Sequence, residues 1–275
     1  MNHIVKFIKN LSFAKILLPL FILIIVGCTT VPVTGRSRVN FIPDSTIMAT
    51  SFQEYDKFLK ENELSKNIKQ AAMVKRVGKN IRQAVEKYFT EQGMTSEINN
   101  YKWEFNLVKG EDKNAWCMPG GKVVVYEGIM PVAKNENGLA VIMGHEIAHA
   151  VAKHGNERMS QGLLIQTGGA LLSVVTNKQS AISKQAFMTA YGIGAQLGFM
   201  LPYSRVHEKE ADYLGLIFMT MAGYDPNEAV SFWKRMAAGG SNQMPEFLST
   251  HPSGATRISE IKAAIPEISS KYKQK

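Results

Sequence analysis

The chain has 275 residues, of which 45% are hydrophobic and 20% charged, a balance typical of folded rather than disordered proteins. Its two cysteines, Cys28 and Cys117, are too few for a disulfide-stapled scaffold or a four-cysteine zinc site. The formal net charge is +9, but no basic patch interleaved with aromatic residues accompanies it, so we expect no nucleic-acid partner.

The first segment, residues 1–27, is typical of an export signal, since it has three lysines, no acid and a short apolar run over 16–26. The run ends in Gly27-Cys28, which resembles a bacterial lipobox, in which the cysteine is lipidated and becomes the new N-terminus. Several acyl chains on Cys28 would hold the protein durably on a membrane, whereas a retained membrane anchor is the alternative. Because Thr29 rather than aspartate follows, we expect an outer-membrane location that faces the periplasm of a Gram-negative bacterium.

The segment 28–46 is rich in Thr, Pro, Gly, Ser and Arg, which predicts a lipid-anchored tether with an extended arm and a short strand at 38–42. One catalytic-sized domain over 47–275 follows. Apolar residues at helical spacing predict helices over 47–62 and 65–92. Apolar–polar alternation predicts a half-buried strand over 101–108, and three consecutive valines predict a buried strand over 122–126. The segment 114–118 is predicted to be an antiparallel partner at the edge of the sheet.

Helices dominate the second half of the predicted domain. One runs from Glu136 to His154, with Asn135 or Asn137 as its N-cap. Others are predicted over 160–175, 182–199, 206–222 and 226–238, and a last helix begins near 253. The fold class is therefore α+β and mostly α, with a small mixed or antiparallel sheet.

The most informative motif is His145-Glu146-Ile147-Ala148-His149. The two histidines are one helical turn apart on one face, so both imidazoles can reach one zinc ion. Glu146 is then placed to take a proton from the zinc-bound water. The residues around the motif are apolar on nearly all sides, so we expect a buried helix rather than a pair of surface histidines.

A third ligand has to come from elsewhere in the chain. A metzincin would have a histidine at position 155, which is Gly155, and His154 lies about 140° round the helix from His149, as expected of a helix-end histidine. Downstream, Glu208 and Asp212 share a helix face. One carboxylate can bind zinc while the other accepts the second N–H of a ligand histidine. By spacing alone, a pair of solvated surface acids is the more frequent case.

The His-Glu-x-x-His motif, followed by Ser-Arg-x-x-Glu-x-Glu-Ala-Asp at 204–212, resembles the gluzincin metallopeptidases. That family includes the CAAX prenyl proteases, the bacterial protease HtpX and periplasmic lipoprotein proteases, and residues 31–36 resemble the start of its mature lipoproteins. The resemblance implies a zincin-like catalytic domain with one Zn²⁺, Glu208 as third ligand and Asp212 as partner of a ligand histidine. The lipoprotein branch is favoured, because no apolar run after the signal is long enough to span a membrane.

Two further segments resemble parts of this family. The first resembles its edge strand beside the active site, which can bind an extended peptide through main-chain hydrogen bonds; from the residues alone, a simple hairpin is the more frequent case. It consists of Asn114, Ala115, Trp116, Cys117 and Met118. Cys117 itself is predicted to be a small buried hydrophobe.

The second is His251-Pro252 with Arg257 six residues on. In the family this histidine is thought to help stabilise the oxyanion, a catalytic role that a nearby hydrogen-bond donor can fill. Our alternative hypothesis is that His251 occupies the open coordination position and keeps the enzyme latent. A loop or capping histidine is the third alternative.

These observations predict a zinc endopeptidase that hydrolyses periplasmic or outer-membrane polypeptides. The resemblance implies quality control of misfolded or misassembled envelope proteins, with the outer-membrane assembly machinery as a further partner class. The competing hypothesis is a periplasmic chaperone or assembly factor with a mainly structural zinc site. An open fourth position beside Glu146 argues against it, because structural zinc sites are closed by four ligands.

Overall fold

The structure is a computed structural model that describes residues 28–175, 185, 188, 201–238, 251 and 254–273. The predicted signal segment 1–27, almost all of the predicted helix over 182–199 and Pro252 lie outside the described residues. Within the described ranges, no helix combines the length and the apolar character that a membrane crossing requires.

The main sheet has three strands in the order β3 (Glu104–Val108), β5 (Lys122–Tyr126) and β4 (Ala115–Met118). Strands β3 and β5 are parallel and β4 and β5 antiparallel, so the sheet is mixed and β4 forms one edge, as predicted. The three valines of β5 are completely buried. Gly120 and Gly121 both have left-handed backbone angles (φ 89° and 85°), which allows the tight turn from β4 into β5.

Helices form most of the described chain and confirm the predicted, mostly α fold class. They are α2 (Asp44–Glu61), α3 (Ile68–Glu91), α4 (Met130–Ala133), α5 (Glu136–Val151), α6 (His154–Val175), α8 (Leu201–Met221), α9 (Glu228–Ala238) and α11 (Ala255–Tyr272), with short 3₁₀ turns at Thr95–Glu97 and Glu127–Ile129. Several predicted boundaries were wrong: α6 begins at residue 154 instead of 160, and α8 begins at residue 201 instead of 206. The helix expected to run to His154 ends at Val151, because Lys153 adopts a left-handed φ of 60°. His154 therefore begins α6 rather than ending α5.

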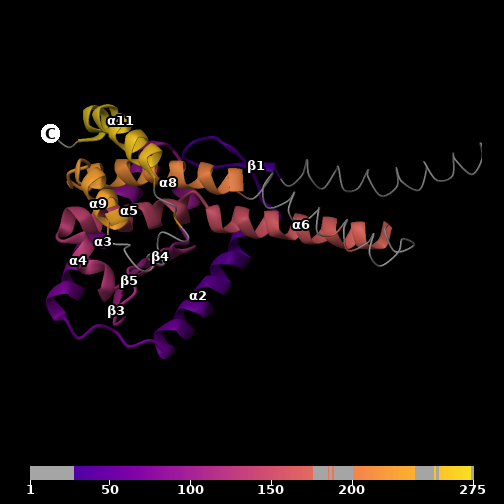
Figure 1. Cartoon of the computed structure of the whole chain (residues 1–275), viewed down its shortest axis with the longest axis horizontal. Helices are drawn as coiled ribbons and strands as arrows, with labels where there is room; N and C mark the ends of the chain where they lie inside the picture. Colours follow the sequence, from indigo (N-terminus) through magenta and orange to yellow (C-terminus); the bar gives the residue numbers. More distant parts are fainter. Residues whose placement is uncertain are drawn as a thin grey trace, which may run out of the picture.

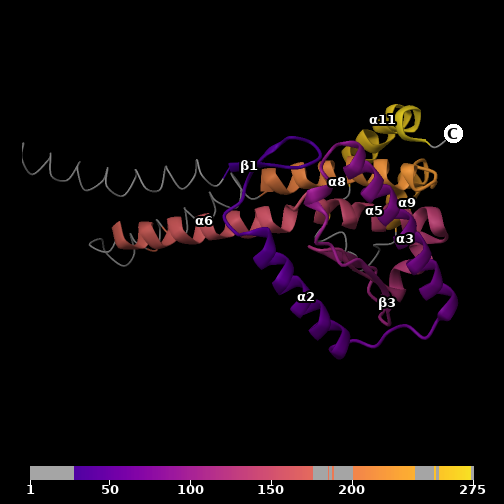
Figure 2. The ribbon, with the colours of Figure 1, turned by 180° about the vertical axis from the view of Figure 1, so that it is seen from behind.

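Helix α5 lies at the centre of the domain, between α8 on one side and the sheet on the other (Figures 1 and 2). Asn135 caps it, since its side chain accepts a hydrogen bond of 3.1 Å from the Gly138 N–H. Every residue from Gly138 to Val151 is buried, which agrees with the apolar surroundings of the sequence motif.

The contact between α5 and α8 depends on two glycines that face one another, Gly144 and Gly215. A Cβ atom at Gly215 would lie 2.9 Å from the backbone nitrogen of His145, too close for a methyl group. The two backbones therefore touch at this point. Asp212 and Glu208 precede Gly215 by about one and two turns, so the contact brings both carboxylates beside α5.

The segment predicted as a tether forms an antiparallel hairpin instead. Its strands are β1 (Cys28–Thr30) and β2 (Ser37–Val39), with Cys28 opposite Val39, so the strand expected at 38–42 ends three residues earlier. The tip between them, residues 31–36, is held by Val31, which is 1% exposed and belongs to the main hydrophobic core. Burial of this apolar side chain explains why the segment folds against the domain.

Candidate metal centre

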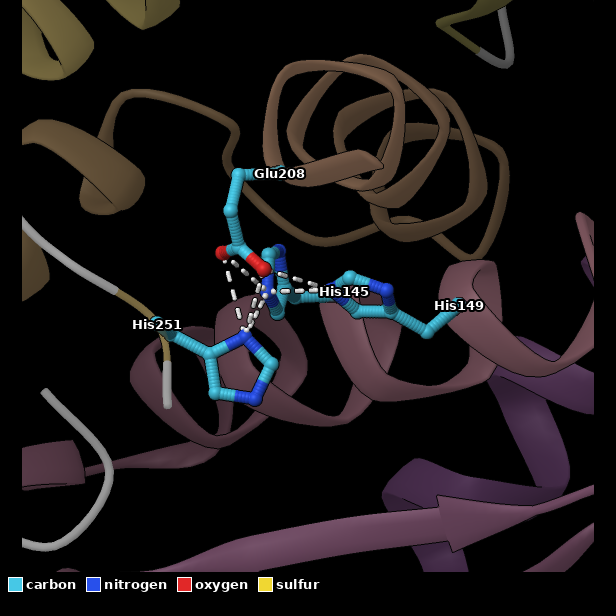
Figure 3. Close-up of side chains that lie close together, drawn as sticks. All are labelled: His145, His149, Glu208 and His251. Carbon is cyan, nitrogen blue, oxygen red and sulfur yellow. Dashed lines mark hydrogen bonds and ion pairs between the residues drawn. The ribbon is translucent and has the colours of Figure 1, made fainter. Parts of the chain in front are cut away.

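Four buried side chains from α5, α8 and the residue at 251 converge on one point (Figure 3). The Nε2 atoms of His145 and His149 are 3.1 Å apart. The two oxygens of Glu208 face different nitrogens. Oε2 lies 3.4 Å from Nε2 of His145, and Oε1 lies 3.4 Å from Nε2 of His149. Nδ1 of His251 lies 3.0 Å from both carboxylate oxygens of Glu208 and 3.2 Å from Nε2 of His145.

The spacing of these atoms fits a zinc ion. In a tetrahedron with zinc–ligand bonds of about 2.05 Å, two ligand atoms are about 3.3 Å apart. The distances within the cluster run from 3.0 to 3.4 Å, and all four ligand atoms lie within 4.8 Å of one another. Imidazole nitrogen and carboxylate oxygen are donors that zinc accepts. His145, His149, Glu208 and His251 could therefore hold one zinc ion, each with one ligand atom.

The carboxylates of Glu208 and Asp212, both on α8, face different atoms of the histidines. Oδ1 of Asp212 lies 3.0 Å from Nδ1 of His145, on the side of the ring away from the cluster. Burial raises the pKa of both carboxyls, but neighbouring cations and hydrogen bonds outweigh burial and lower each pKa below its ordinary value. For Glu208 the hydrogen bonds come from the three histidines, and for Asp212 from Arg257 and His145. Both carboxyls are therefore ionised at neutral pH.

Glu146 lies next to the cluster with an unsatisfied acceptor. Its side chain is buried, and Oε1 has no hydrogen-bond partner among the described residues. Nε2 of His251 lies 3.6 Å from this oxygen. Burial raises the pKa of the Glu146 carboxyl. A buried acceptor without a hydrogen-bond partner is costly, so this oxygen calls for a donor that the described residues do not supply.

Comparison with known proteins identifies this arrangement. The sequence model of Peptidase family M48 matches residues 76–265, which include α5, α8 and His251. The chain belongs to peptidase family M48. Membership in M48, together with the His/His/Glu/His group, makes the chain a zinc metallopeptidase and confirms the predicted enzyme class and cofactor.

Several curated proteins are similar to this M48 chain. The mitochondrial metalloendopeptidase OMA1 of Schizosaccharomyces pombe is 38% identical over 174 residues, which cover 62% of this chain and 49% of that protein. OMA1 of Bos taurus is 30% identical over 243 residues, 86% of this chain and 46% of that protein. The β-barrel assembly-enhancing protease of Escherichia coli K12 is 29% identical over 184 residues, 64% of this chain and 38% of that protein. The chain spans about half, or less, of the length of these relatives. The lipoprotein branch within M48 stays a prediction.

The remaining residues singled out in the sequence have defined places in the M48 fold. Residues 115–118 form β4, which packs on α5, while Asn114 precedes the strand and accepts a hydrogen bond from the Tyr126 N–H. Among the described strands, β4 pairs with β5 alone and forms one edge of the sheet. Cys117 is half-buried, and burial raises the pKa of its thiol well above the ordinary value. Cys28 is the first residue of β1.

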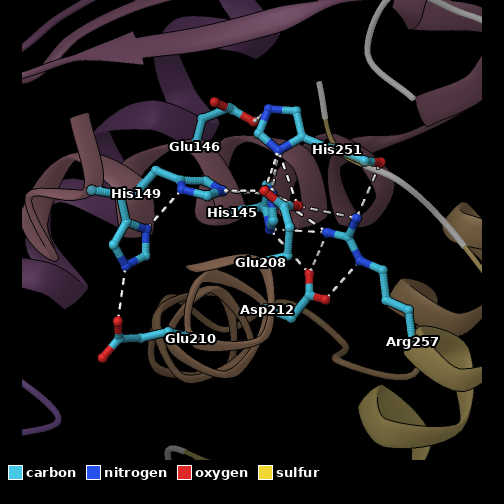
Figure 4. A network of polar contacts seen from close by, with 9 residues as sticks. His145, Glu146, His149, Glu208, Glu210, Asp212, His251 and Arg257 are labelled. Carbon is cyan, nitrogen blue, oxygen red and sulfur yellow. Dashed lines mark hydrogen bonds and ion pairs between the residues drawn. The ribbon is translucent and has the colours of Figure 1, made fainter. Parts of the chain in front are cut away.

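Sequence reasoning gave no role to Arg257, although its spacing from His251 was noticed. Its guanidinium donates two hydrogen bonds of 2.7 Å to the Asp212 carboxylate, from Nε and Nη2 (Figure 4). Nη1 lies 3.2 Å from Oε2 of Glu208 and 3.3 Å from the backbone oxygen of His251. The guanidinium also stacks on the Trp233 ring, 3.5 Å from its centroid. The Arg257 guanidinium thus contacts the carboxylates of Glu208 and Asp212 and the backbone oxygen of His251.

Proposed function

We propose that this chain is a zinc endopeptidase of the Gram-negative periplasm, held at the outer membrane by a lipidated Cys28. Its substrates would be misfolded or misassembled envelope proteins, and the outer-membrane assembly machinery is a partner class. The name of the Escherichia coli relative, a β-barrel assembly-enhancing protease, supports this substrate class. The export-signal pattern and the Gly27-Cys28 ending support the location. Other relatives are named as mitochondrial, so the location is tested separately from the enzyme activity.

The observation that carries the peptidase function is the buried Oε1 of Glu146, which has no hydrogen-bond partner among the described residues and lies beside the His145, His149 and Glu208 cluster. These three residues would hold the zinc, which supplies Lewis acidity that polarises a peptide carbonyl and acidifies a water molecule. Glu146 accepts the proton of the attacking water at Oε1 and passes it to the leaving amine. Asp212 fixes the ring of His145 through Nδ1. The substrate lies along the sheet edge at β4 as an added strand.

His251 has two roles in this proposal, one in each state of the enzyme. Its Nδ1 lies within the cluster, 3.0 Å from Oε1 of Glu208. In the proposal this placement, which would close the fourth position of a bound zinc ion, belongs to the latent state. When its side chain leaves that position, a ring N–H of His251 is available to donate to the oxyanion of the transition state. The His251→Ala variant should lose cleavage rate and change zinc affinity. If both stay at wild-type values, both roles are wrong.

The deciding variant for the enzyme is Glu146→Gln, measured on an unfolded polypeptide. We expect a loss of about 10²- to 10⁴-fold in kcat, because a positioned general base contributes about that much. Zinc content should remain one per chain. The matched control is Glu86→Gln, a half-exposed glutamate on α3 that pairs with Arg82, and it should cleave at the wild-type rate. A Glu146→Gln protein that keeps full function in cells without cleaving would favour the chaperone with a structural zinc, and one that cleaves at the wild-type rate would refute Glu146 as the general base.

The location is tested by Cys28→Ser. We expect the wild-type chain in the outer-membrane fraction, with an acylated N-terminal cysteine at residue 28 by mass spectrometry, and the variant unprocessed or released. A wild-type chain that keeps residues 1–27 would show a retained anchor and refute the lipoprotein proposal. The cleavage assay of the previous paragraph uses purified protein and is independent of this result.

A further inference from the structure

A second buried polar cluster begins at His149 and leads away from the metal site to the N-terminal hairpin. Nδ1 of His149 lies 2.8 Å from Nδ1 of His154, and Nε2 of His154 lies 2.9 Å from Oε2 of Glu210. His154 is completely buried, and Glu210 is 7% exposed. The sequence match gave Glu210 no function, and His154 was predicted to end a helix, so neither position was assigned a role.

The chemistry of this chain of contacts fixes the direction of its hydrogen bonds. An ionised carboxylate only accepts, so Nε2 of His154 must carry the proton and donate to Glu210. In a neutral imidazole the other nitrogen then accepts, and Nδ1 of His149 must donate to it. This leaves Nε2 of His149 without a proton. That atom is the one that faces Nε2 of His145 and Oε1 of Glu208 in the metal cluster.

The hairpin tip supplies the groups that hold Glu210. The hydroxyl of Thr34 donates to Oε1 of Glu210, and Nε of Arg36 donates to Oε2 at 3.0 Å. The same guanidinium donates from Nη1 and Nη2 to the two oxygens of Glu157, at 3.0 and 2.7 Å. Glu157 lies on α6 and Glu210 on α8, so the tip ties these two helices together beside His154.

We propose that Arg36 and Thr34 are positioning residues for the metal site and act on His149 through Glu210 and His154. The hairpin tip holds Glu210 as an acceptor, Glu210 orients His154, and His154 keeps Nε2 of His149 free for the metal. Outer partners of this kind commonly change metal affinity by 10- to 100-fold. The inference rests on the proposed role of His149 as a ligand.

The test measures zinc affinity by competition with a chelator, at a temperature where every variant is folded by circular dichroism. We expect His154→Leu and Arg36→Gln each to weaken zinc binding by about 10- to 100-fold. Glu210→Gln keeps an oxygen that accepts from His154, so it should lose less affinity than Glu210→Leu. The control is Arg235→Gln, which removes a comparably exposed arginine from Glu228 and from the Val132 carbonyl, with no contact to His149.

The outcomes separate this inference from the proposed function. His149→Ala serves as the reference and should lose most zinc binding; if it does not, the ligand assignment under the proposed function is wrong. If His149→Ala loses zinc while His154→Leu and Arg36→Gln bind it with wild-type affinity, the inference is wrong and the ligand assignment stands. An equal loss of affinity in Arg235→Gln would also overturn it, since the effect would then follow from general destabilisation.

Discussion

Replacing Gly215 by alanine tests whether backbone contact between α5 and α8 sets the geometry of the metal site. The new Cβ would lie 2.9 Å from the His145 nitrogen and 3.1 Å from the Gly144 carbonyl carbon. Carbon atoms pack at about 3.5 Å or more, so the helices must separate by about 0.5 Å. Neither contact is with a side chain that could rotate away. The same shift moves Glu208 and Asp212, which precede Gly215 on α8, away from His145.

We expect Gly215→Ala to destabilise the fold by about 1 to 3 kcal/mol, the usual cost of overpacking, and to lower Tm by about 2 to 10 °C. Zinc affinity should fall by roughly tenfold, because the carboxylates are displaced relative to the histidines. The control is Gly162→Ala on α6, where no atom of the described residues outside the local helix backbone lies within 4 Å of the new Cβ, and it should keep or raise Tm. If Gly215→Ala matches wild type in Tm and zinc affinity, the two helices do not need this contact and the reasoning is refuted.

Three more predictions follow from the same contacts. Arg257→Leu leaves the buried Asp212 carboxylate without its cation and should cost about 3 to 5 kcal/mol in urea unfolding; wild-type stability would show that the pair is not needed. Removal of zinc by a chelator should lower Tm, and its return should restore Tm, since free zinc at 100 times Kd adds about 2.7 kcal/mol to the free energy of unfolding. A Tm that is the same with and without zinc would contradict the metal site. Burial raises the pKa of Glu157, but hydrogen bonds with His207 and Arg36 outweigh burial and lower it from 4.5 to about 2. Because this folded pKa is depressed, its stabilising effect is complete above pH 4.5 and is lost as the pH falls towards 2. Acid unfolding of Arg36→Gln should therefore begin at a higher pH than in wild type, and an unchanged acid midpoint would contradict the pairing.

Local patterns in the sequence predicted the parts of the fold that depend on neighbours along the chain. The valines of β5 and the apolar residues around His145 report burial directly, so the strand and the central helix were predicted within a few residues. The end of α5 was predicted three residues late, because nothing in the sequence marks Lys153 as left-handed. The hairpin at 28–39 was taken for a tether because its Pro, Gly and Thr residues are typical of loops, whereas burial of Val31 decides its fold.

The long-range contacts that orient the metal site could not be predicted from local sequence patterns. Arg36 meets Glu157 and Glu210 across 121 and 174 positions, and Arg257 meets Asp212 across 45. Periodicity tells which face of a helix is buried, but it does not tell which distant cation a buried carboxylate will meet. A buried charge requires a partner, but the spacing of Glu208 and Asp212 alone favoured solvated surface acids, so the sequence did not predict that these carboxylates would be buried and paired.

The register between α5 and α8 decides which carboxylate serves which purpose. Both helices carry their polar groups four residues apart, His145 and His149 on one and Glu208 and Asp212 on the other, so spacing alone allows either acid to bind zinc. In the structure only Glu208 faces the Nε2 atoms of both histidines, at 3.4 Å each, whereas Asp212 faces Nδ1 of His145. A slip of α8 by one residue would move both acids by about 1.5 Å along the helix and turn them by about 100°. The close contact at Gly215 opposes that slip. It therefore keeps Glu208 at the metal-binding nitrogens and Asp212 at Nδ1 of His145.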